Sequence, residues 1–521
     1  MTGNGYKIVL TAGRTLMSEY HQATFLGFSS TMPRGLIPDE MFFTYLVPSV
    51  DVNGDGSVVS AQLGQRKIEA ALLDYGYSRD DVIVAHPDYL DRVVGPNTRV
   101  LGLTEHDPLG LGPPTSTFSQ CIGGEPYNFS KFKEILAHPN VAKYKPKIIL
   151  GGGGAWQFKN PKTQDEYSIH CVCIGEGDKV IGPLCDKAIA GEELPRVVYG
   201  RMAAVNEIPL IRGPTICGLI EIARGCGRGC DFCVPDMLRV RYRPVEDILK
   251  EVEVNVATGR QPLLHSEDVL RYGAPTIKVN GEAVSNLFKA VKAYPGVKSV
   301  GISHFCLASA YSAPEVVEEV SNILNLGDNN GQLWISGQTG VETGSPRMVE
   351  KHMTGKVKPF KAEEWPDVVV GAFDLLNRHH WVPAGTILIG LPEETDRDVE
   401  KTIDMVKRLR NYKSVLVPMF TVATDPEYGQ SFTVDRMTEM QGELFLTCWE
   451  HDAAWAEKLV DEYITDADKA TADGIRSVIS LSVGAITDII NKCRREYHCN
   501  IPAMIKDYKE LYGPEPRQVI N

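Results

Sequence analysis

The chain has 521 residues, which is enough for two or three domains with sizeable hydrophobic cores. It is 43% hydrophobic and 23% charged, no apolar run is long enough to span a bilayer, and the first residues lack the pattern of a signal peptide, so we expect no membrane association. The net charge of -13 argues against broad binding to nucleic-acid phosphates. Twelve cysteines are too dilute for a disulfide scaffold, so we expect a protein of the reducing cytoplasm.

Residues 1–205 alternate short apolar strands with helices and glycine turns. The pattern predicts a helix over 65–75 and strands at 6–12, 81–85, 99–103 and 147–150, and the run 171–178 ends another strand. Such alternation is typical of a parallel, doubly wound α/β sheet of the Rossmann-like type. Ligands on that architecture bind at the carboxyl ends of the strands, so the loops after Ala12, Leu103 and Leu150 are the expected site.

Residues 206–430 repeat a strand-helix unit six times. The predicted strands are 218–222, 262–264, 298–302, 333–341, 386–389 and 414–420. Between them, apolar residues recur at helical spacing, as at Val284, Leu287, Phe288 and Val291. Six such units predict a partial (β/α)6 barrel, with its chemistry at the carboxyl ends of the strands.

Residues 431–521 predict a helical domain with long helices over 439–463 and 467–495, which we expect to cap the mouth of the barrel. Near its end, Cys493 and Cys499 flank His498. These three side chains are either a second metal site or ordinary residues on a helix, and the second interpretation is favoured because a fourth ligand is missing.

Three cysteines carry the strongest chemical signal in the chain. Cys226, Cys230 and Cys233 follow the apolar run 217–223 with the spacing Cys-x3-Cys-x2-Cys. Three thiolates can bind three irons of a [4Fe-4S] cluster and leave one iron open to a small chelating ligand, because nothing close in the sequence offers a fourth thiolate. A structural zinc site is the alternative, but it requires four ligands.

At these cysteines the chain resembles the radical S-adenosylmethionine (SAM) superfamily. The resemblance implies that the open iron is chelated by the amino and carboxylate groups of SAM, and that an electron from the cluster cleaves its sulfonium to give a 5'-deoxyadenosyl radical. Phe232 matches the aromatic position whose backbone lies beside the adenine.

The same resemblance extends to the ends of three later strands. The motif that grips the SAM ammonium corresponds to Ser266, Glu267 and Asp268, and the sequence leaves open which of the three does so. Glu342 and Ser345 resemble residues that reach the ribose or the carboxylate of SAM, and Ile389 lies in the strand that packs on the adenine.

Two glycine-rich segments precede the cluster cysteines. A Gly-x-Gly-x-x-Gly turn is missing after the first strand, so nicotinamide and flavin are unlikely ligands. The pair of segments resembles the cobalamin-binding domain of cobalamin-dependent radical SAM enzymes, in which the nucleotide tail lies near such loops. The implied cobalamin contacts in these segments are Gly151, Gly152, Gly153, Gly154, Gly175, Glu176 and Gly177.

The loop 104–116 would then face the cobalt or the edge of the corrin. The resemblance implies contacts from Thr104, Glu105, His106, Thr115 and Ser116. His106 is either a cobalt ligand or, as the favoured interpretation, a loop histidine that is hydrogen-bonded to its neighbours.

Two other interpretations of residues 1–205 stay open. The domain could be a bare sheet that serves as a docking module, in which case the chain could be a non-catalytic, metal-knotted scaffold. It could also carry the second cluster of a methylthiotransferase, which uses three N-terminal cysteines. The cysteines available for that cluster are Cys121, Cys171, Cys173 and Cys185.

Taken together, the resemblance implies a cobalamin-dependent (class B) radical SAM C-methyltransferase that uses a [4Fe-4S] cluster, SAM and cobalamin. SAM methylates cobalamin and, in a second role, yields the radical that activates an unreactive substrate carbon. No Ser/His/Asp arrangement is visible, so no catalytic residue is assigned.

The substrate is suggested by similarity alone. The runs 265–273, 338–347 and 351–356 resemble archaeal glutamine C-methyltransferases of methanogens, which modify methyl-coenzyme M reductase. The expected partners are therefore a protein substrate, the alpha subunit of that reductase, and a low-potential electron donor. Another peptide or a small molecule is the alternative substrate.

Overall fold

The computed structural model describes residues 4–22, 24–233, 239–328, 331–424, 430–463 and 468–512. These residues form two compact units, which are not contiguous in sequence. Unit 1 contains residues 1–115, 125–220 and 246–260, and unit 2 contains residues 116–124, 221–245 and 261–521. The predicted domain boundaries at 205 and 430 stay predictions.

Unit 1 is built on a six-stranded parallel sheet with the strand order β2-β1-β3-β4-β5-β6. This confirms the predicted doubly wound α/β fold. The strands are β1 (Ile8–Thr11), β2 (Val82–Val84), β3 (Val100–Thr104), β4 (Lys147–Gly151), β5 (Cys171–Ile174) and β6 (Val197–Tyr199).

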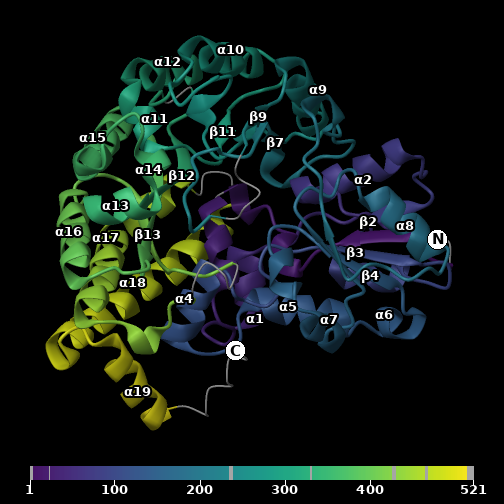
Figure 1. Cartoon of the computed structure of the whole chain (residues 1–521), viewed down its shortest axis with the longest axis horizontal. Helices are drawn as coiled ribbons and strands as arrows, with labels where there is room; N and C mark the ends of the chain where they lie inside the picture. Colours follow the sequence, from purple (N-terminus) through teal and green to yellow (C-terminus); the bar gives the residue numbers. More distant parts are fainter. Residues whose placement is uncertain are drawn as a thin grey trace. The chain divides into compact units, whose positions relative to one another are not determined.

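Helices cover both faces of this sheet, because successive side chains of each buried strand point to opposite sides. In β1, Ile8 and Leu10 join the apolar core on one face and Val9 joins the core on the other. The first face carries α2 (Leu63–Tyr75) and α8 (Ile181–Ile189), and the second carries α3 (Leu90–Val93), α5 (Tyr127–Leu136) and α6 (Pro139–Tyr144). Further helices in this part of the chain are α1 (Asp39–Met41), α7 (Pro161–Glu166) and α9 (Val245–Val256), all labelled in Figure 1.

The six strands predicted for the barrel are present in two three-stranded sheets, and all of them except β7, which ends at the start of a unit 2 segment, lie within unit 2. Their orders are β11-β10-β7 and β12-β13-β14. A parallel bridge between His304 and Gln338 joins the end of β11 to β12, so the two sheets continue one another as an open partial barrel. The strands are β7 (Leu219–Glu221), β10 (Leu263–His265), β11 (Gly301–Ile302), β12 (Ile335–Glu342), β13 (Trp381–Ile389) and β14 (Val415–Phe420).

The barrel helices lie outside these strands (Figure 1). In α10 the residues at helical spacing, Val284, Leu287, Phe288 and Val291, are all fully buried, as predicted. The other helices are α11 (Leu307–Ser312), α12 (Pro314–Leu324), α13 (Pro346–His352), α14 (Thr354–Val357), α15 (Trp365–Arg378) and α16 (Asp396–Arg408).

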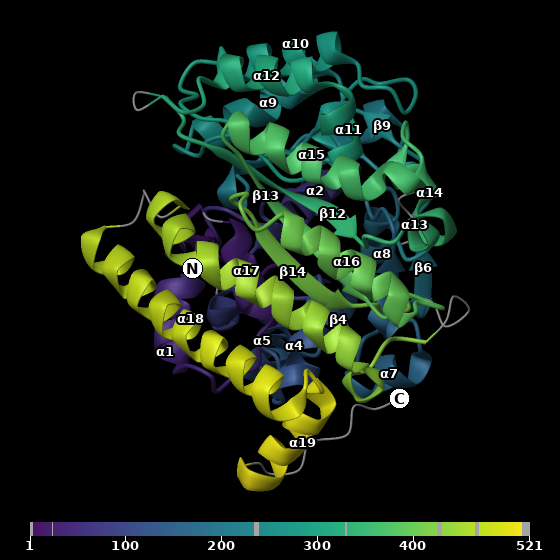
Figure 2. The same cartoon turned by 90° about the vertical axis from the view of Figure 1, so that its left-hand side faces the viewer.

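The C-terminal helices are α17 (Glu439–Tyr463), α18 (Lys469–Tyr497) and α19 (Ile501–Tyr512). The expected cap over the barrel mouth is wrong for α17, which packs beside α16 and runs back along β14 (Figure 2). Its Gln441 bonds Glu394 after β13, and its His451 bonds Ser414 just before β14. This helix therefore covers the side of the strands, and α18 packs on it.

The predicted loop 104–116 is shorter than expected. Helix α4 (Pro113–Ile122) begins inside it, at two prolines. Proline suits a first helical turn because its φ angle is already helical and because amides in this turn have no partner within the helix, so its missing N–H costs nothing there. No helix in the part of the chain that the structure describes is long and apolar enough to cross a membrane.

The strand order of unit 1 reverses between β1 and β3, so the loops after these strands diverge around the crevice where such sheets bind ligands. Glu105 lies in the loop after β3, is 2% exposed and accepts a hydrogen bond from the Gly13 amide at 2.7 Å. Burial raises the pKa of Glu105 to about 8. The carboxyl group therefore holds its proton in the folded protein up to nearly neutral pH.

We predict that Glu105→Gln removes a pH-dependent loss of stability. Because the folded pKa lies above the unfolded value of 4.5, the wild type binds an extra proton when folded, and its stability falls as the pH rises from about 5 to about 8. Glutamine keeps the acceptor for Gly13 and cannot ionise, so the variant should gain roughly 2 to 4 kcal/mol over wild type above pH 8. Thermal unfolding across a pH series measures this difference.

Glu40→Gln is the matched control, since Glu40 is an exposed carboxylate of the same unit. Its pH profile should follow wild type. A Glu105→Gln profile that also follows wild type would show that Glu105 is ionised in the folded protein.

Candidate active site

The three motif cysteines lie on one loop of unit 2. Residues 225–233 follow β8 (Ala223–Arg224), which pairs in an antiparallel manner with β9 (Arg241–Tyr242). We call residues 225–233 the cluster loop. The sequence analysis did not predict this strand pair, which fixes the start of the loop beside the end of β7.

The donor chemistry of the loop fits an iron-sulfur cluster. Cys226 and Cys230 are half-buried and Cys233 is exposed, and none of the three forms a disulfide. Burial raises the pKa of Cys230 to about 12, with Lys356 opposing the shift. No group of three His, Cys, Asp or Glu side chains in the described ranges is gathered closely enough to hold a metal ion. The fit of the cluster loop to a [4Fe-4S] cluster therefore rests on its three thiols and their spacing. Iron binding would bring the three sulfurs together.

Arg228, between the first two cysteines, anchors the loop to the barrel. Its guanidinium is buried and donates to Asp268 Oδ2 and to Ser309 Oγ, both at 2.8 Å. It also donates to the carbonyl oxygens of Gly355 and Lys356, both at 3.1 Å. Burial would lower the pKa of Arg228, but Cys306 and Asp268 hold it above its usual value, so the guanidinium stays charged.

Asp231, between the second and third cysteines, forms a second anchor. Its amide donates to the His352 carbonyl at 3.1 Å, and its carboxylate Oδ2 lies 2.6 Å from His352 Nδ1. The other ring nitrogen, Nε2, lies 3.0 Å from the carbonyl oxygen of Pro392, in the turn after β13. His352 is buried, whereas the Asp231 side chain is half exposed.

A buried ion pair lies next to Cys230. Lys356 Nζ donates to Glu342 Oε1 at 2.5 Å, and Thr386 donates to the other carboxylate oxygen at 3.1 Å. Burial would lower the pKa of Lys356, but Glu342 and Cys230 raise it above its ordinary value. A Cβ at Gly340 would lie 1.8 Å from Lys356 Nζ, so a side chain there would displace this ion pair. A fixed positive charge therefore stands beside the cluster loop.

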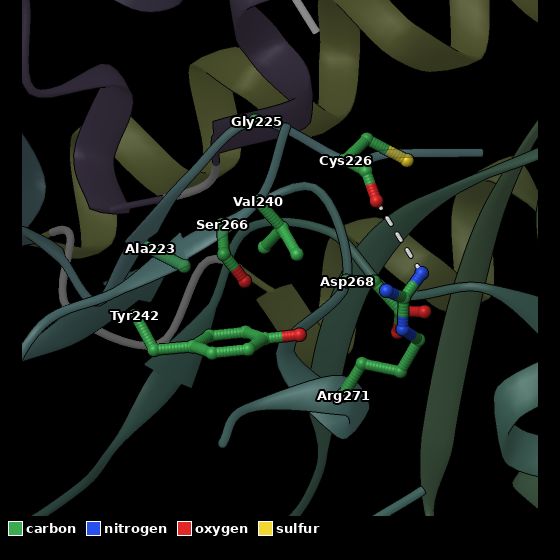
Figure 3. Close-up of a pocket in the computed structure, with 8 residues that line it drawn as sticks. All are labelled: Ala223, Gly225, Cys226, Val240, Tyr242, Ser266, Asp268 and Arg271. Carbon is green, nitrogen blue, oxygen red and sulfur yellow. Dashed lines mark hydrogen bonds between the residues drawn. The ribbon is translucent and has the colours of Figure 1, made fainter. Parts of the chain in front are cut away.

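A small cavity behind Cys226 holds several of the predicted SAM contacts (Figure 3). Its lining residues are Ala223, Gly225, Cys226, Val240, Tyr242, Ser266, Asp268 and Arg271. The hydroxyl of Ser266 is buried without a partner among the described residues, and Arg271 donates to the Cys226 carbonyl at 3.3 Å. The cavity has room for about one water molecule, so it holds at most one end of a larger ligand.

The remaining residues expected to contact SAM are placed as follows. Phe232 and Glu267 are half-buried, and Phe232 adjoins Cys233 on the cluster loop. Ser345 is fully buried and donates to Asp398 Oδ1 at 2.6 Å, so its hydroxyl already has a structural partner. Ile389 is fully buried, and its carbonyl accepts from Thr421. Their assignment to SAM stays a prediction.

In unit 1 the glycine run 151–154 packs against the loop after β3. A Cβ at Gly152, whose φ is +93°, would lie 2.5 Å from the Glu105 carbonyl oxygen, and one at Gly154 would lie 2.5 Å from that of His106. Gly151 pairs with Thr104 in the sheet. Gly153 differs, because a side chain there would meet nothing within 4 Å. Close backbone packing explains Gly152 and Gly154 without a ligand, whereas Gly153 faces open space.

His106 is exposed, and its ring makes no hydrogen bond to any residue the structure describes. Desolvation lowers the pKa of His106, with Asp107 opposing the shift. Both interpretations of this residue, cobalt ligand and loop histidine, stay predictions.

The other residues predicted to contact cobalamin have mixed environments. Gly175 is exposed, Gly177 is half-buried, and Glu176 accepts a hydrogen bond from the Ala203 amide at 2.9 Å. Thr115 and Ser116 lie in helix α4 rather than in a loop. The Thr115 hydroxyl is buried without a partner among the described residues, and Ser116 accepts from Gln120.

Two findings concern cysteines outside the motif. Cys306 lies close to the cluster loop, since its thiol donates to the same Lys356 carbonyl as Arg228, at 3.5 Å. The sequence analysis missed this fourth thiol because 73 residues separate it from Cys233. At the end of α18, Cys499 donates to Glu443 at 3.1 Å, as expected for an ordinary polar contact.

The residues that hold the cluster loop were missed as functional residues. Arg228 and Asp231 could have been noticed, because a charged residue in a glycine-rich loop between metal ligands needs a partner. Their partners, Asp268 and His352, carry no such signal in the sequence.

Curated relatives with similar sequences are methylthiotransferases. The ribosomal protein uS12 methylthiotransferase RimO of Thermoanaerobacter sp. (strain X514) is 25% identical over 322 residues, 59% of this chain and 69% of that protein. The tRNA-2-methylthio-N(6)-dimethylallyladenosine synthases of Aeromonas hydrophila and Moorella thermoacetica are 22% and 26% identical. The match to the Aeromonas protein covers 54% of this chain and 56% of that protein, and the match to the Moorella protein covers 46% of this chain and 51% of that protein.

The fold resembles that of the radical SAM methyltransferase TsrM from Kitasatospora setae. One structure of TsrM, with tryptophan and a SAM analogue bound, has a TM-score of 0.50 and 14% sequence identity, and the match covers 79% of this chain and 73% of that chain. A second, with cobalamin and a [4Fe-4S] cluster bound, has the same TM-score and covers 72% of that chain.

Residues 220–406, which include the cluster loop and both of its anchors, match the model of the radical SAM superfamily. This part of the chain is therefore similar to radical SAM domains, which use a [4Fe-4S] cluster and SAM.

Proposed function

We propose that this protein is a cobalamin-dependent radical SAM C-methyltransferase. The observation that carries the proposal is the packing of the glycine run 151–154 against the loop after β3, where Gly154 contacts the backbone of the exposed His106 and a side chain at Gly153 would meet nothing within 4 Å. Doubly wound sheets bind large ligands at such loops after the strands. The likeness in fold to TsrM, whose structure holds cobalamin, supports the same assignment.

The residues present fit the three cofactors. Cys226, Cys230 and Cys233 would hold the cluster, and Ser266, in the cavity beside Cys226, and Glu267, after β10, would contact SAM. His106 and Gly153 would contact the cobalamin. Bound together, these groups supply a carbon-centred radical and a methyl donor, while the protein orients the substrate and excludes water.

A methylthiotransferase is the second candidate, and the curated relatives favour it. That function would use a second cluster on thiols of unit 1. The structure instead places Cys171 and Cys185 in the apolar core beside α2 and α8, and burial raises the pKa of each to about 12. Both side chains belong to the apolar core of unit 1, and this packing role favours the methyltransferase.

For the substrate, we propose a glutamine side chain of a protein, with the alpha subunit of methyl-coenzyme M reductase as the first candidate. The support is the sequence resemblance of residues 265–273, 338–347 and 351–356 to archaeal enzymes of that kind. Other peptides and small molecules are the alternatives. A low-potential protein electron donor in the cytoplasm would complete the system, because the cluster must be reduced before SAM is cleaved.

The decisive experiment incubates the anaerobically reconstituted full chain with SAM, methylcobalamin, a low-potential reductant and glutamine-containing peptides of the reductase. Mass spectrometry reads the product. A gain of one methyl group together with 5'-deoxyadenosine supports the proposal. A gain of a methylthio group identifies a methylthiotransferase, and deoxyadenosine formation without methylated peptide excludes this substrate.

We predict that alanine at any one of Cys226, Cys230 or Cys233 abolishes 5'-deoxyadenosine formation, because two thiolates cannot hold the cubane with an open iron. Iron analysis and the visible spectrum after reconstitution measure cluster content, which should be about four irons in the wild type. Cys171→Ala is the matched control and should keep the wild-type iron content. A loss of about half the iron in Cys171→Ala would instead reveal a second cluster.

We predict that Gly153→Val weakens cobalamin binding by roughly tenfold or more, since the new side chain clashes with nothing but a ligand. The measurement is titration of the protein with cobalamin, followed by its visible spectrum. Gly484→Val on α18 is the control, because this position also has open space and belongs to unit 2. Equal cobalamin affinities of the wild type, Gly153→Val and Gly484→Val would show that the glycine run does not contact cobalamin.

A further inference from the structure

The backbone of the cluster loop is flexible by composition. Gly225, Gly227 and Gly229 alternate with other residues and have φ angles of +78°, +72° and +69°. Glycine loses more conformational freedom on ordering than any other residue, so a loop of this composition needs strong contacts to hold one shape. The contacts come from the two charged residues of the loop, Arg228 and Asp231.

The two anchors reach different parts of the barrel. Arg228 is held by Asp268 after β10, by Ser309 on α11 and by carbonyls of α14. Asp231 is held by His352, the last residue of α13. Arg228 fixes the segment between Cys226 and Cys230, and Asp231 fixes the segment between Cys230 and Cys233.

The ring of His352 lies between two hydrogen-bonding partners. Its Nε2 lies 3.0 Å from the Pro392 carbonyl oxygen, which can only accept. Its Nδ1 lies 2.6 Å from Asp231 Oδ2 on the cluster loop. His352 therefore bridges the cluster loop and the turn after β13, with one ring nitrogen directed at each.

We propose that His352 is a positioning residue for the iron-sulfur cluster. Through Asp231 it holds Cys230 and Cys233 in register with the turn after β13, the strand that resembles the adenine-packing strand of the superfamily. This inference rests on the radical SAM function and adds to it a residue that lies outside the cysteine motif. Glutamine cannot replace the ring, because its single amide group cannot bond two partners on opposite sides.

The test compares His352→Gln, Asp231→Asn and the double variant with the wild-type full chain, each reconstituted anaerobically. The measurements are the rate of iron loss to a chelator, the midpoint potential of the cluster and the EPR spectrum of the reduced cluster. Each single variant should lose iron roughly tenfold faster than wild type and show an altered EPR spectrum, the scale expected for a lost charge-assisted bond. The double variant should resemble either single variant, since both remove the same contact.

His451→Gln is the matched control. His451 is also buried in unit 2, but it bonds Ser414 before β14 and no residue of the cluster loop. This variant should lower the melting temperature and leave the cluster spectra unchanged. If His352→Gln does not fold, the Asp231→Asn variant tests the proposal, because the Asp231 side chain is half exposed and its replacement should not prevent folding.

The outcomes separate this inference from the proposed function. Wild-type chelator resistance and EPR spectra in both single variants would overturn the role of His352. A wild-type chain that forms no reducible cluster would overturn the radical SAM function on which the inference rests.

Discussion

The buried ion pair between Arg228 and Asp268 holds the active site together. Taking two charges out of water costs several kcal/mol for each ion, and their attraction compensates only when further hydrogen bonds satisfy the remaining donors and acceptors. Here both carboxylate oxygens are used, since Asp268 also accepts from the Cys306 amide and from the Ser309 hydroxyl. The pair is therefore stable only with the end of β10, helix α11 and the cluster loop in place together.

This constraint links the chemistry of the loop to the fold of the barrel. The loop starts at β8, which pairs with β9, and is then tied to elements that lie 40 to 128 residues further along the chain. Lys356 belongs to the same arrangement, since its carbonyl accepts from Arg228 while its ammonium pairs with Glu342 beside Cys230. The strands thus do more than support the loop, because their ends supply the charges that shape it.

Much of the fold could be predicted from the sequence because its signals are local. The residues Val284, Leu287, Phe288 and Val291 recur at helical spacing within a single helix, so the sequence alone predicts their shared face. All four are buried in the structure. The position of α17 could not be read in this way, because an apolar helix face does not say which strand it packs on. The predicted loop 104–116 was too long, because Pro113 and Pro114 are compatible with the start of a helix as well as with a loop.

For the candidate site, the sequence identifies the kinds of side chain that could bind SAM better than it identifies which residue makes each contact. Ser266, Glu267 and Asp268 are equivalent candidates by position and chemistry. The structure distinguishes their surroundings, because Asp268 already accepts from Arg228 and Ser309 and so also serves as the counter-ion of the cluster loop. The hydroxyl of Ser266 is buried in the cavity beside Cys226, without a partner among the described residues. An acidic residue at a strand end thus has a structural task here that its position in the sequence does not reveal, and the contacts of all three residues to SAM stay predictions.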